Sequence, residues 1–269
     1  MTLGVRARRA SFLEARLRSI VEWEVEREKR IAEQVVEHDW GRTFLSPAVP
    51  LVWDANWILI EQTGMAVDEI IAAADRSIGS AGMRHRTVVA REPEDGRRLV
   101  PEFESRGWGI EPGLRMIVRR APDRKSEIEV AERRMDEIAE LRAELVRKQL
   151  AEIGVRDEDV TEQLLEWERR IGVCDGDRWF VAPANGEPAS ACRLLAREGI
   201  GQVEDVGTLP EARGQGLARA VTLAAAEASE HDGNRLTFLA AAADDWPRLL
   251  YEKLGFDEIG CLYAFRRRP

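Results

Sequence analysis

The sequence has little of what would indicate a disulfide framework, a zinc site or a membrane span. Its three cysteines are odd in number and widely spaced, which argues against paired disulfides. No C-x-x-C pair and only three histidines are present, so no metal site is expected. The apolar stretch 217–228 is interrupted by two charged residues, and no run approaches the roughly 20 apolar residues of a membrane helix. The charged amino-terminal segment lacks the apolar core of a signal peptide. We therefore expect a cytoplasmic protein without a membrane partner.

Excess positive charge is also missing. The chain has 40 basic and 49 acidic residues, a net charge of −9. Phosphate backbones need a concentrated cationic face, so no nucleic-acid partner is expected. The acidic balance permits a cationic substrate. With 269 residues and 44% hydrophobic content, the chain is long enough for two domains that each bury a core.

The polar stretch 121–126 divides the pattern of expected helices and strands, which predicts domains at 1–122 and 123–269. In the first half, apolar spacing predicts one helix over 7–38 and β-branched residues predict a strand over 51–60. Further helices are expected at 67–78 and 96–106, and strands at 87–90 and 114–119.

The second half alternates strands with helices, which predicts an α/β (α+β) fold with a mixed central sheet flanked by helices. The expected strands are 127–133, 179–182, 189–196, 201–207, 235–240 and 258–266, and the expected helices are 136–153, 157–171, 217–231 and 246–254. Asp157 or Asp159 is expected to be the N-cap of the helix 157–171. The acidic residues of 157–171 (Glu158, Asp159, Glu162, Glu166 and Glu168) are interpreted as a solvated helix face, with a rim for a cationic amine as the alternative.

Both halves close on the same pattern of strand, helix, Gly-aromatic pair and strand with a basic end. Gly107-Trp108 and Gly255-Phe256 occupy equivalent places, 148 residues apart. Recurring order at a fixed offset indicates two copies of one unit.

A strand that runs into Pro210 is followed by Arg213-Gly214-Gln215-Gly216 and then by an Ala-rich helix. Glycines let backbone N–H groups approach phosphate oxygens, and the unpaired N–H groups and dipole of a helix N-terminus favour negative charge. Arg213 could add a charge-assisted bond. No Gly-Lys-Ser/Thr and no third glycine follow, which excludes the two commonest nucleotide loops.

The segment Arg213-Gly214-Gln215-Gly216-Leu217-Ala218 resembles the Arg/Gln-x-x-Gly-x-Gly/Ala motif of the GNAT acyltransferase superfamily, and the segment 250–256 resembles its second hallmark. The resemblance covers about 127–269. It implies that acetyl-coenzyme A is the acyl donor, held by Val206, Gly207, Thr208, Arg213, Gly214, Gln215, Gly216, Leu217, Ala218 and Asp244. Asp244 replaces the family's usual asparagine.

The resemblance also implies catalytic roles. Tyr251 would be the general acid at the coenzyme A sulfur, because a phenol is protonated at neutral pH; the alternative is a tyrosine that only packs on the sheet. Strand alternation sends Glu204 and Asp205 to opposite faces, so one of them should face the cleft as the base. Glu204 is preferred and Asp205 is held in reserve, and both could instead be structural carboxylates. The backbone N–H of Val206 could polarise the thioester carbonyl.

The first half has Phe103 where the second has Tyr251, and no matching glycine loop, so that copy is expected to have lost cofactor binding. We expect an acetyl-coenzyme A-dependent N-acetyltransferase that acts on a small-molecule amine by direct attack, as a monomer or homodimer. The alternatives are a non-catalytic coenzyme A-binding sensor and an acetyltransferase of protein N-termini or lysines.

Overall fold

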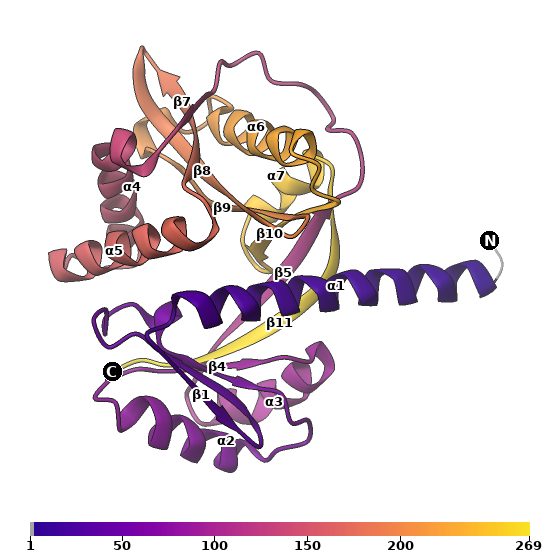
Figure 1. Cartoon of the computed structure of the whole chain (residues 1–269), viewed down its shortest axis with the longest axis vertical. Helices are drawn as coiled ribbons and strands as arrows, with labels where there is room; N and C mark the ends of the chain where they lie inside the picture. The colour runs from indigo at the N-terminus through magenta and orange to yellow at the C-terminus, as the bar shows by residue number, and fades with distance from the viewer. Residues whose placement is uncertain (1–2) are drawn as a thin grey trace. The chain divides into compact units, whose positions relative to one another are not determined.

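The computed structural model describes residues 3–269, with side chains from residue 11 on, and the chain divides into two compact units. The first unit contains the chain up to residue 115 together with 241–245 and 258–269, and the second contains 116–240 and 246–257. The units are therefore not continuous in sequence, whereas the expected boundary at 122/123 is a single cut. Both are α/β with mixed sheets flanked by helices, as expected (Figure 1). No helix among the described residues is long and apolar enough to cross a membrane.

The first unit has a sheet with the strand order β1-β2-β3-β4-β11-β5. Its elements are α1 (Leu3–Ile31), β1 (Gln34–His38), β2 (Gly41–Leu45), the 3-10 turn η1 (Trp53–Ala55), β3 (Trp57–Ile60), α2 (Val67–Ala74), the π-helix η2 (Asp75–Gly79), β4 (Arg86–Ala90), α3 (Pro93–Ser105), β5 (Gly109–Val118) and the end of β11 (Phe256–Arg267).

Period-two alternation gives this sheet two apolar faces. One face, with Phe44 and Leu59, packs against Leu17 and Val21 of α1. The other packs against α2 and α3 through a larger cluster of buried residues that includes Ile58, Ile70, Val88, Leu99 and Phe265. Helices therefore cover both faces of the first sheet (Figure 1).

Two expectations for the first half are wrong at their ends. The helix predicted over 7–38 stops at Ile31, and Gln34–His38 forms an antiparallel hairpin with β2. Gly41 enforces this hairpin, because a Cβ there would lie 2.0 Å from the Leu59 carbonyl oxygen. The strand predicted over 51–60 is limited to Trp57–Ile60. The buried Asn56 amide donates to the carbonyls of Val49 and Val52, at 3.1 and 3.0 Å, and folds the preceding residues into a turn.

The second unit has the strand order β5-β10-β9-β8-β7-β6. Its elements are the end of β5, β6 (Ala131–Arg133), the 3-10 turn η3 (Met135–Ile138), α4 (Ala139–Glu152), α5 (Glu158–Asp175), β7 (Arg178–Ala184), β8 (Glu187–Arg197), β9 (Ile200–Thr208), the 3-10 turn η4 (Pro210–Ala212), α6 (Leu217–His231), β10 (Leu236–Ala242), α7 (Pro247–Lys253) and the start of β11.

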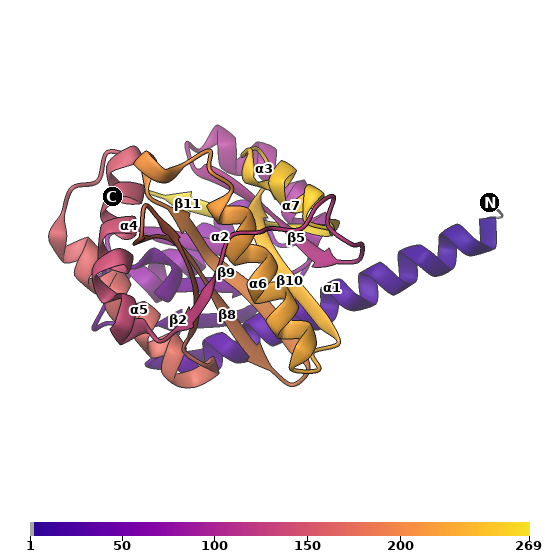
Figure 2. The same cartoon turned by 90° about the horizontal axis from the view of Figure 1, so that it is seen from above.

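These elements follow the expected order, but the strand expected over 127–133 is limited to Ala131–Arg133. The turns Asn185-Gly186 and Glu198-Gly199 have positive φ at both residues, the geometry that two-residue hairpins prefer. Asp157 caps α5 by accepting a hydrogen bond from the Asp159 amide at 3.0 Å. α4 packs on one face of β7 and β8 around Trp179, and α6 lies over β8 and β9 (Figure 2).

The two halves repeat one order of elements. β3-α2-β4-α3-β5 in the first half corresponds to β9-α6-β10-α7-β11 in the second. In each half the strand before the first of these helices pairs in parallel with the strand after it, β3 with β4 and β9 with β10. Gly107 and Gly255 follow α3 and α7 with φ of +75° and +94°. The fold therefore supports the interpretation of two copies of one unit.

Candidate functional site

The loop between β9 and α6 has the geometry of an anion cradle. Gly214 and Gly216 have φ of +80° and +83°, where other residues are strained. A Cβ at Gly214 would meet no atom within 4 Å, and one at Gly216 only Ile128 Cδ1 at 3.8 Å, so the space before the loop is open. The N–H groups of Gly214, Gln215 and Gly216 donate no hydrogen bond to any residue that the structure describes. Together with the first turn of α6, from Leu217 and Ala218, they form a site for an anionic group.

Arg213 has a partner within the protein. Its Nη2 lies 2.6 Å from Glu152 Oε1 of α4, and its Nε donates to the Thr208 carbonyl oxygen at 3.4 Å. Both side chains of the ion pair are about half exposed, with relative exposures of 49% and 49%. An exposed pair of this kind contributes little to stability. The guanidinium is therefore available to exchange Glu152 for a ligand anion.

β9 carries a bulge just before this loop. Arg193 of β8 faces Glu204 and Ala191 faces Gly207, so Asp205 and Val206 together oppose one residue. Asp205 has φ +55°, an uncommon value for a residue with a side chain. The bulge interrupts the β8–β9 pairing at the segment that the resemblance assigns to the cofactor arm, Val206–Thr208.

The expectation that Glu204 and Asp205 point to opposite faces is wrong. Both carboxylates reach the guanidinium of Arg193, whose Nη2 lies 2.7 Å from Asp205 Oδ2 and 3.3 Å from Glu204 Oε2. The bulge and the positive φ of Asp205 break the alternation that a regular strand would impose. Gln202, two residues before on the same face, donates to Glu204 Oε1 at 3.1 Å.

A buried network extends from these carboxylates to α4 and α5. Arg142 binds Glu168 through two hydrogen bonds of 2.8 and 2.7 Å and lies 3.4 Å from Asp205 Oδ1. Arg193 donates to the Glu168 backbone carbonyl at 2.9 Å. The ring of Trp179 lies 5.2 Å from each guanidinium carbon, a cation–π arrangement. Two guanidinium groups thus form ion pairs with three carboxylates next to the bulge.

Burial sets the electrostatics of this network. The side chains of Arg193 and Arg142 are 2% and 3% exposed, while those of Glu204 and Asp205 are 29% and 22% exposed. Burial raises the pKa of Glu168, and the charge of Arg142 acts against this. Burial alone would lower the pKa of Arg142, but the charges of Asp205 and Glu168 raise it. The Arg142 guanidinium therefore keeps its charge, and the exposed side of the network is formed by the carboxylates of Glu204 and Asp205.

Most of this network was not expected from the sequence. Glu158, Asp159 and Glu162 are exposed, as a solvated helix face requires, but Glu168 is buried and that part of the interpretation is wrong. Arg193 offered a signal, since it is charged at an inward-facing position of the apolar strand 189–196. Arg142 offered none, because arginine is ordinary in a charged helix.

The remaining predicted residues lie near α7. Tyr251 is on α7 and 8% exposed, and its ring packs edge-on against Phe256 at 6.2 Å. Asp244 is exposed in the turn before α7, and this turn belongs to the first compact unit. Cys192 is buried, donates to the Val221 carbonyl at 3.1 Å, and has a pKa raised by burial, which suits a packing residue.

The first half lacks the corresponding features. The segment before α2 has a single glycine, Gly64. Phe103, the counterpart of Tyr251, is fully buried and stacks on Phe265 at 4.2 Å. In the described residues the cradle geometry is thus found before α6 and not before α2.

Comparison with known proteins agrees with this geometry. Residues 175–258 match the model of the acetyltransferase (GNAT) domain. Among solved structures, a GCN5-related N-acetyltransferase from Kribbella flavida is 17% identical with a TM-score of 0.61, over 94% of this chain and 95% of that one. A functionally unknown conserved protein from Staphylococcus epidermidis is 15% identical with a TM-score of 0.67, over 88% and 94%. A tandem GNAT protein from the clavulanic acid biosynthesis pathway is 15% identical with a TM-score of 0.52, over 84% and 78%. No curated protein matches.

The fold and the match together define the class. Residues 175–258, in the second half of the chain, match the GNAT acetyltransferase domain, and the whole chain resembles a tandem GNAT protein in fold. The first half is the copy without the glycine loop.

Proposed function

We propose that the chain is an acetyl-coenzyme A-dependent N-acetyltransferase with one working site, in its second half. The observation that carries the proposal is the loop 213–216, with two positive-φ glycines and unpaired N–H groups at the start of a 15-residue helix. The fit to a pyrophosphate is good, because the loop is exposed and no side chain fills the space before it. Gly214, Gln215, Gly216, Leu217 and Ala218 would hold the phosphates.

The residues of β9 and α7 would provide the rest of the chemistry. Bound acetyl-coenzyme A would supply an activated acetyl group. Val206, Gly207 and Thr208 would orient the cofactor arm along the strand beyond the bulge. The Tyr251 hydroxyl would donate a proton to the departing sulfur, and the Glu204 carboxylate would take one from the incoming ammonium, with Asp205 as the second candidate. The Val206 N–H would donate to the carbonyl oxygen.

The acceptor is proposed to be a small cationic amine. Three carboxylates oppose two guanidinium groups in the network, and Glu204 and Asp205 are its exposed members. A partly exposed surplus of negative charge attracts an ammonium group and repels anions.

Calorimetric titration of coenzyme A and acetyl-coenzyme A tests the proposal. We expect one site per chain, lost in Gly216→Trp because the indole fills the space before the loop. Gly233→Trp is the matched control, since Gly233 lies after the other end of α6 with φ +82° and no atom within 4 Å of a Cβ. It carries a similar backbone strain but should bind normally. Two sites would show that the first half binds cofactor, and absence of binding would refute the proposal.

One observation favours a second candidate, a coenzyme A-binding module without catalysis. Both candidate bases are already ion-paired with Arg193, a contact that suits structural carboxylates. Coenzyme A binding without turnover of any amine in a broad panel would support this candidate.

A further inference from the structure

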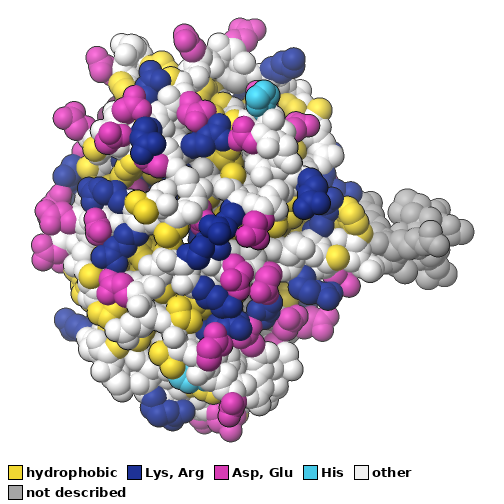
Figure 3. Space-filling view, in the orientation of Figure 1, with side chains coloured by type: hydrophobic (Ala, Val, Ile, Leu, Met, Phe, Trp, Pro, Cys, Tyr) yellow, Lys and Arg dark blue, Asp and Glu magenta, His cyan; other side chains and the backbone are white. Residues whose placement is uncertain are grey.

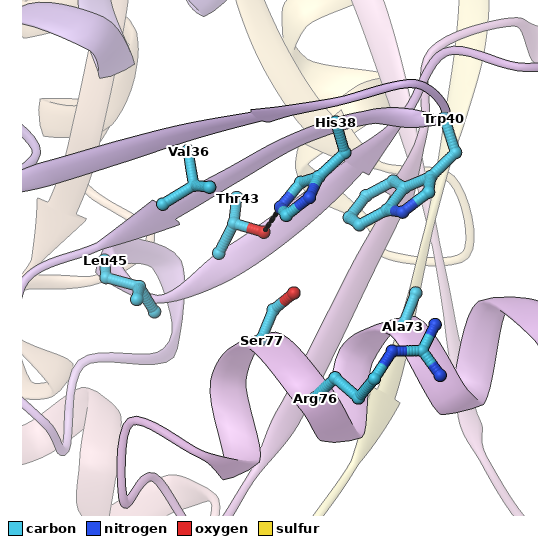
Figure 4. A pocket seen from close by; sticks show the side chains of 8 residues that line it. All are labelled: Val36, His38, Trp40, Thr43, Leu45, Ala73, Arg76 and Ser77. Atoms are coloured by element: carbon cyan, nitrogen blue, oxygen red, sulfur yellow. Dashed lines mark hydrogen bonds between the residues drawn. The ribbon is translucent and has the colours of Figure 1, made fainter.

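The first unit contains a pocket that the acyl-transfer proposal does not use. It lies between the β1–β2 hairpin and the segment α2–η2, with a volume of about 390 Å³ (Figure 4). A second hollow of about 450 Å³ adjoins it and shares Trp40, Ala73 and Arg76. Volumes of this size suit a small molecule.

The helical segments over the two sheets differ, although η2, which continues α2, also contacts β2. In the second unit the 15-residue α6 covers β7 and β8 as well as β9. In the first unit α2 has only eight residues and packs on β3 and β4. The chain then widens into the π-helix η2, a form that often marks functional positions. The face of the β1–β2 hairpin is left open above Ala73, Arg76 and Ser77 (Figure 4).

An aromatic surface forms the hairpin wall. The rings of His38 and Trp40 are stacked on each other, with centroids 4.3 Å apart and planes inclined by 9°. His38 is held by a hydrogen bond of 2.9 Å between its Nε2 and Thr43 Oγ1. Leu45 and the 43%-exposed Val36 extend this wall. A further planar ring can pack against such a stack, on its outer face or edge-on.

The opposite wall carries a guanidinium group with free donors. Arg76 is exposed and makes no ion pair or hydrogen bond with any residue that the structure describes. Of the nearby acidic residues, Asp68 pairs with Arg106 at 2.9 Å and Asp75 with Arg86 at 2.7 Å, whereas Glu69 accepts only the Ala66 amide, at 3.2 Å, and keeps its negative charge. A guanidinium with free donors is suited to a carboxylate.

We propose that this pocket binds a small planar aromatic carboxylate, with its ring on the His38–Trp40 surface and its carboxylate on Arg76. The site lies wholly in the first unit, in the copy without the glycine loop, and does not depend on the proposed acetyltransferase activity. It gives that copy a ligand of its own.

The test is a ¹⁹F NMR titration of the full chain with 4-(trifluoromethyl)benzoate, beside its neutral amide. A ligand of this size is expected to bind with a Kd of about 1 mM. The neutral amide should bind about tenfold more weakly, because it forms no charge-assisted bond with Arg76. This comparison uses only the wild-type protein, so it does not depend on a variant folding.

Variants then locate the site. Arg76→Gln should weaken binding of the carboxylate about tenfold and leave binding of the amide unchanged. The substitution and the replacement of the carboxylate by the amide each remove the same interaction, so their effects should not add. Trp40→Leu should weaken both ligands. Arg84→Gln, at another exposed arginine of the same unit, should change neither. The proposal is overturned by the absence of saturation, by equal affinities for the two ligands, or by an Arg76→Gln affinity that matches wild type.

Discussion

The chain has two tyrosines, and their surroundings make them a matched pair for testing the proton donor. Tyr251 is buried on α7 against Phe256. Tyr263 lies on β11, in the first unit, where its hydroxyl accepts a hydrogen bond of 3.4 Å from Arg97 Nε. Replacing either with phenylalanine removes one oxygen and keeps the ring packing.

Tyr251→Phe is expected to lower kcat about 10²–10⁴-fold, the usual contribution of a general acid, with coenzyme A affinity unchanged. Tyr263→Phe should leave kcat unchanged. The measurement is steady-state turnover of an amine that the wild-type protein acetylates, together with calorimetric binding of coenzyme A. Full turnover in Tyr251→Phe would show that the thiolate obtains its proton elsewhere.

At the residue scale, a site residue could be predicted from the sequence when its residue type and position occur in few structural contexts. Two glycines before a helix are typical of few structures, and Gly214 and Gly216 both adopt a left-handed conformation that glycine favours. An arginine or glutamate in a charged helix has many uses, so the buried pair of Arg142 and Glu168 could not be distinguished from surface charge. Its existence depends on contacts between α4, α5 and β8 that no local pattern encodes.

At the scale of elements, the bulge of β9 depends on Arg193. This side chain holds Asp205 and Glu204 on the outer side and the Glu168 carbonyl on the inner side. The bulge was not predicted, because 201–207 was interpreted as a regular strand, although Val203 and Val206 are three residues apart with two carboxylates between them. Asp205 at positive φ costs on the order of 1 kcal/mol or more, which the surrounding contacts must offset.

Arg193→Met is expected to destabilise the protein by about 3 kcal/mol. Loss of one partner leaves buried or half-buried carboxylates without compensation, and the partial exposure of Glu204 and Asp205 places the cost at the lower end for broken buried pairs. Urea unfolding followed by tryptophan fluorescence measures it. Arg147→Met, which breaks the exposed pair with Glu158, is the control and should show no measurable change. Equal effects of the two variants would contradict a structural role for the network.

The ends of helices and strands also depend on contacts that a local sequence pattern does not contain. The helix α6 begins and ends where the pattern predicts, because glycines flank it on both sides. The long first helix was extended too far, since Val35 continues the helical spacing and also fits the alternation of β1. A residue that satisfies both periods cannot decide between them. Gly41, whose position requires the absence of a Cβ, decides it only through its contact with β3.

At the scale of the whole molecule, the two copies share their closing strands. β5 begins in the first unit and ends in the second, whereas β11 begins in the second and ends in the first. In the first unit β11 pairs antiparallel with β4, with Phe265 opposite Val88. The sequence predicted both strands and their repeat, but a strand's pattern does not state which neighbour it pairs with. Neither unit is therefore expected to be complete without a strand from the other half of the sequence.

Two phenylalanines on β11 test this arrangement, because both are fully buried and each lies in a different unit. Phe265 stacks on Phe103 in the core of the first unit, and Phe256 packs beside Tyr251 in the second. Either change to alanine should cost about 3–5 kcal/mol. Hydrogen exchange measured by mass spectrometry should show Phe265→Ala loosening β4 and α3, and Phe256→Ala loosening α7 and β10. Identical exchange patterns in the two variants would mean that the chain opens as one cooperative body. Distinct patterns would show that the last twelve residues of the sequence, 258–269, stabilise the half of the protein that is made first.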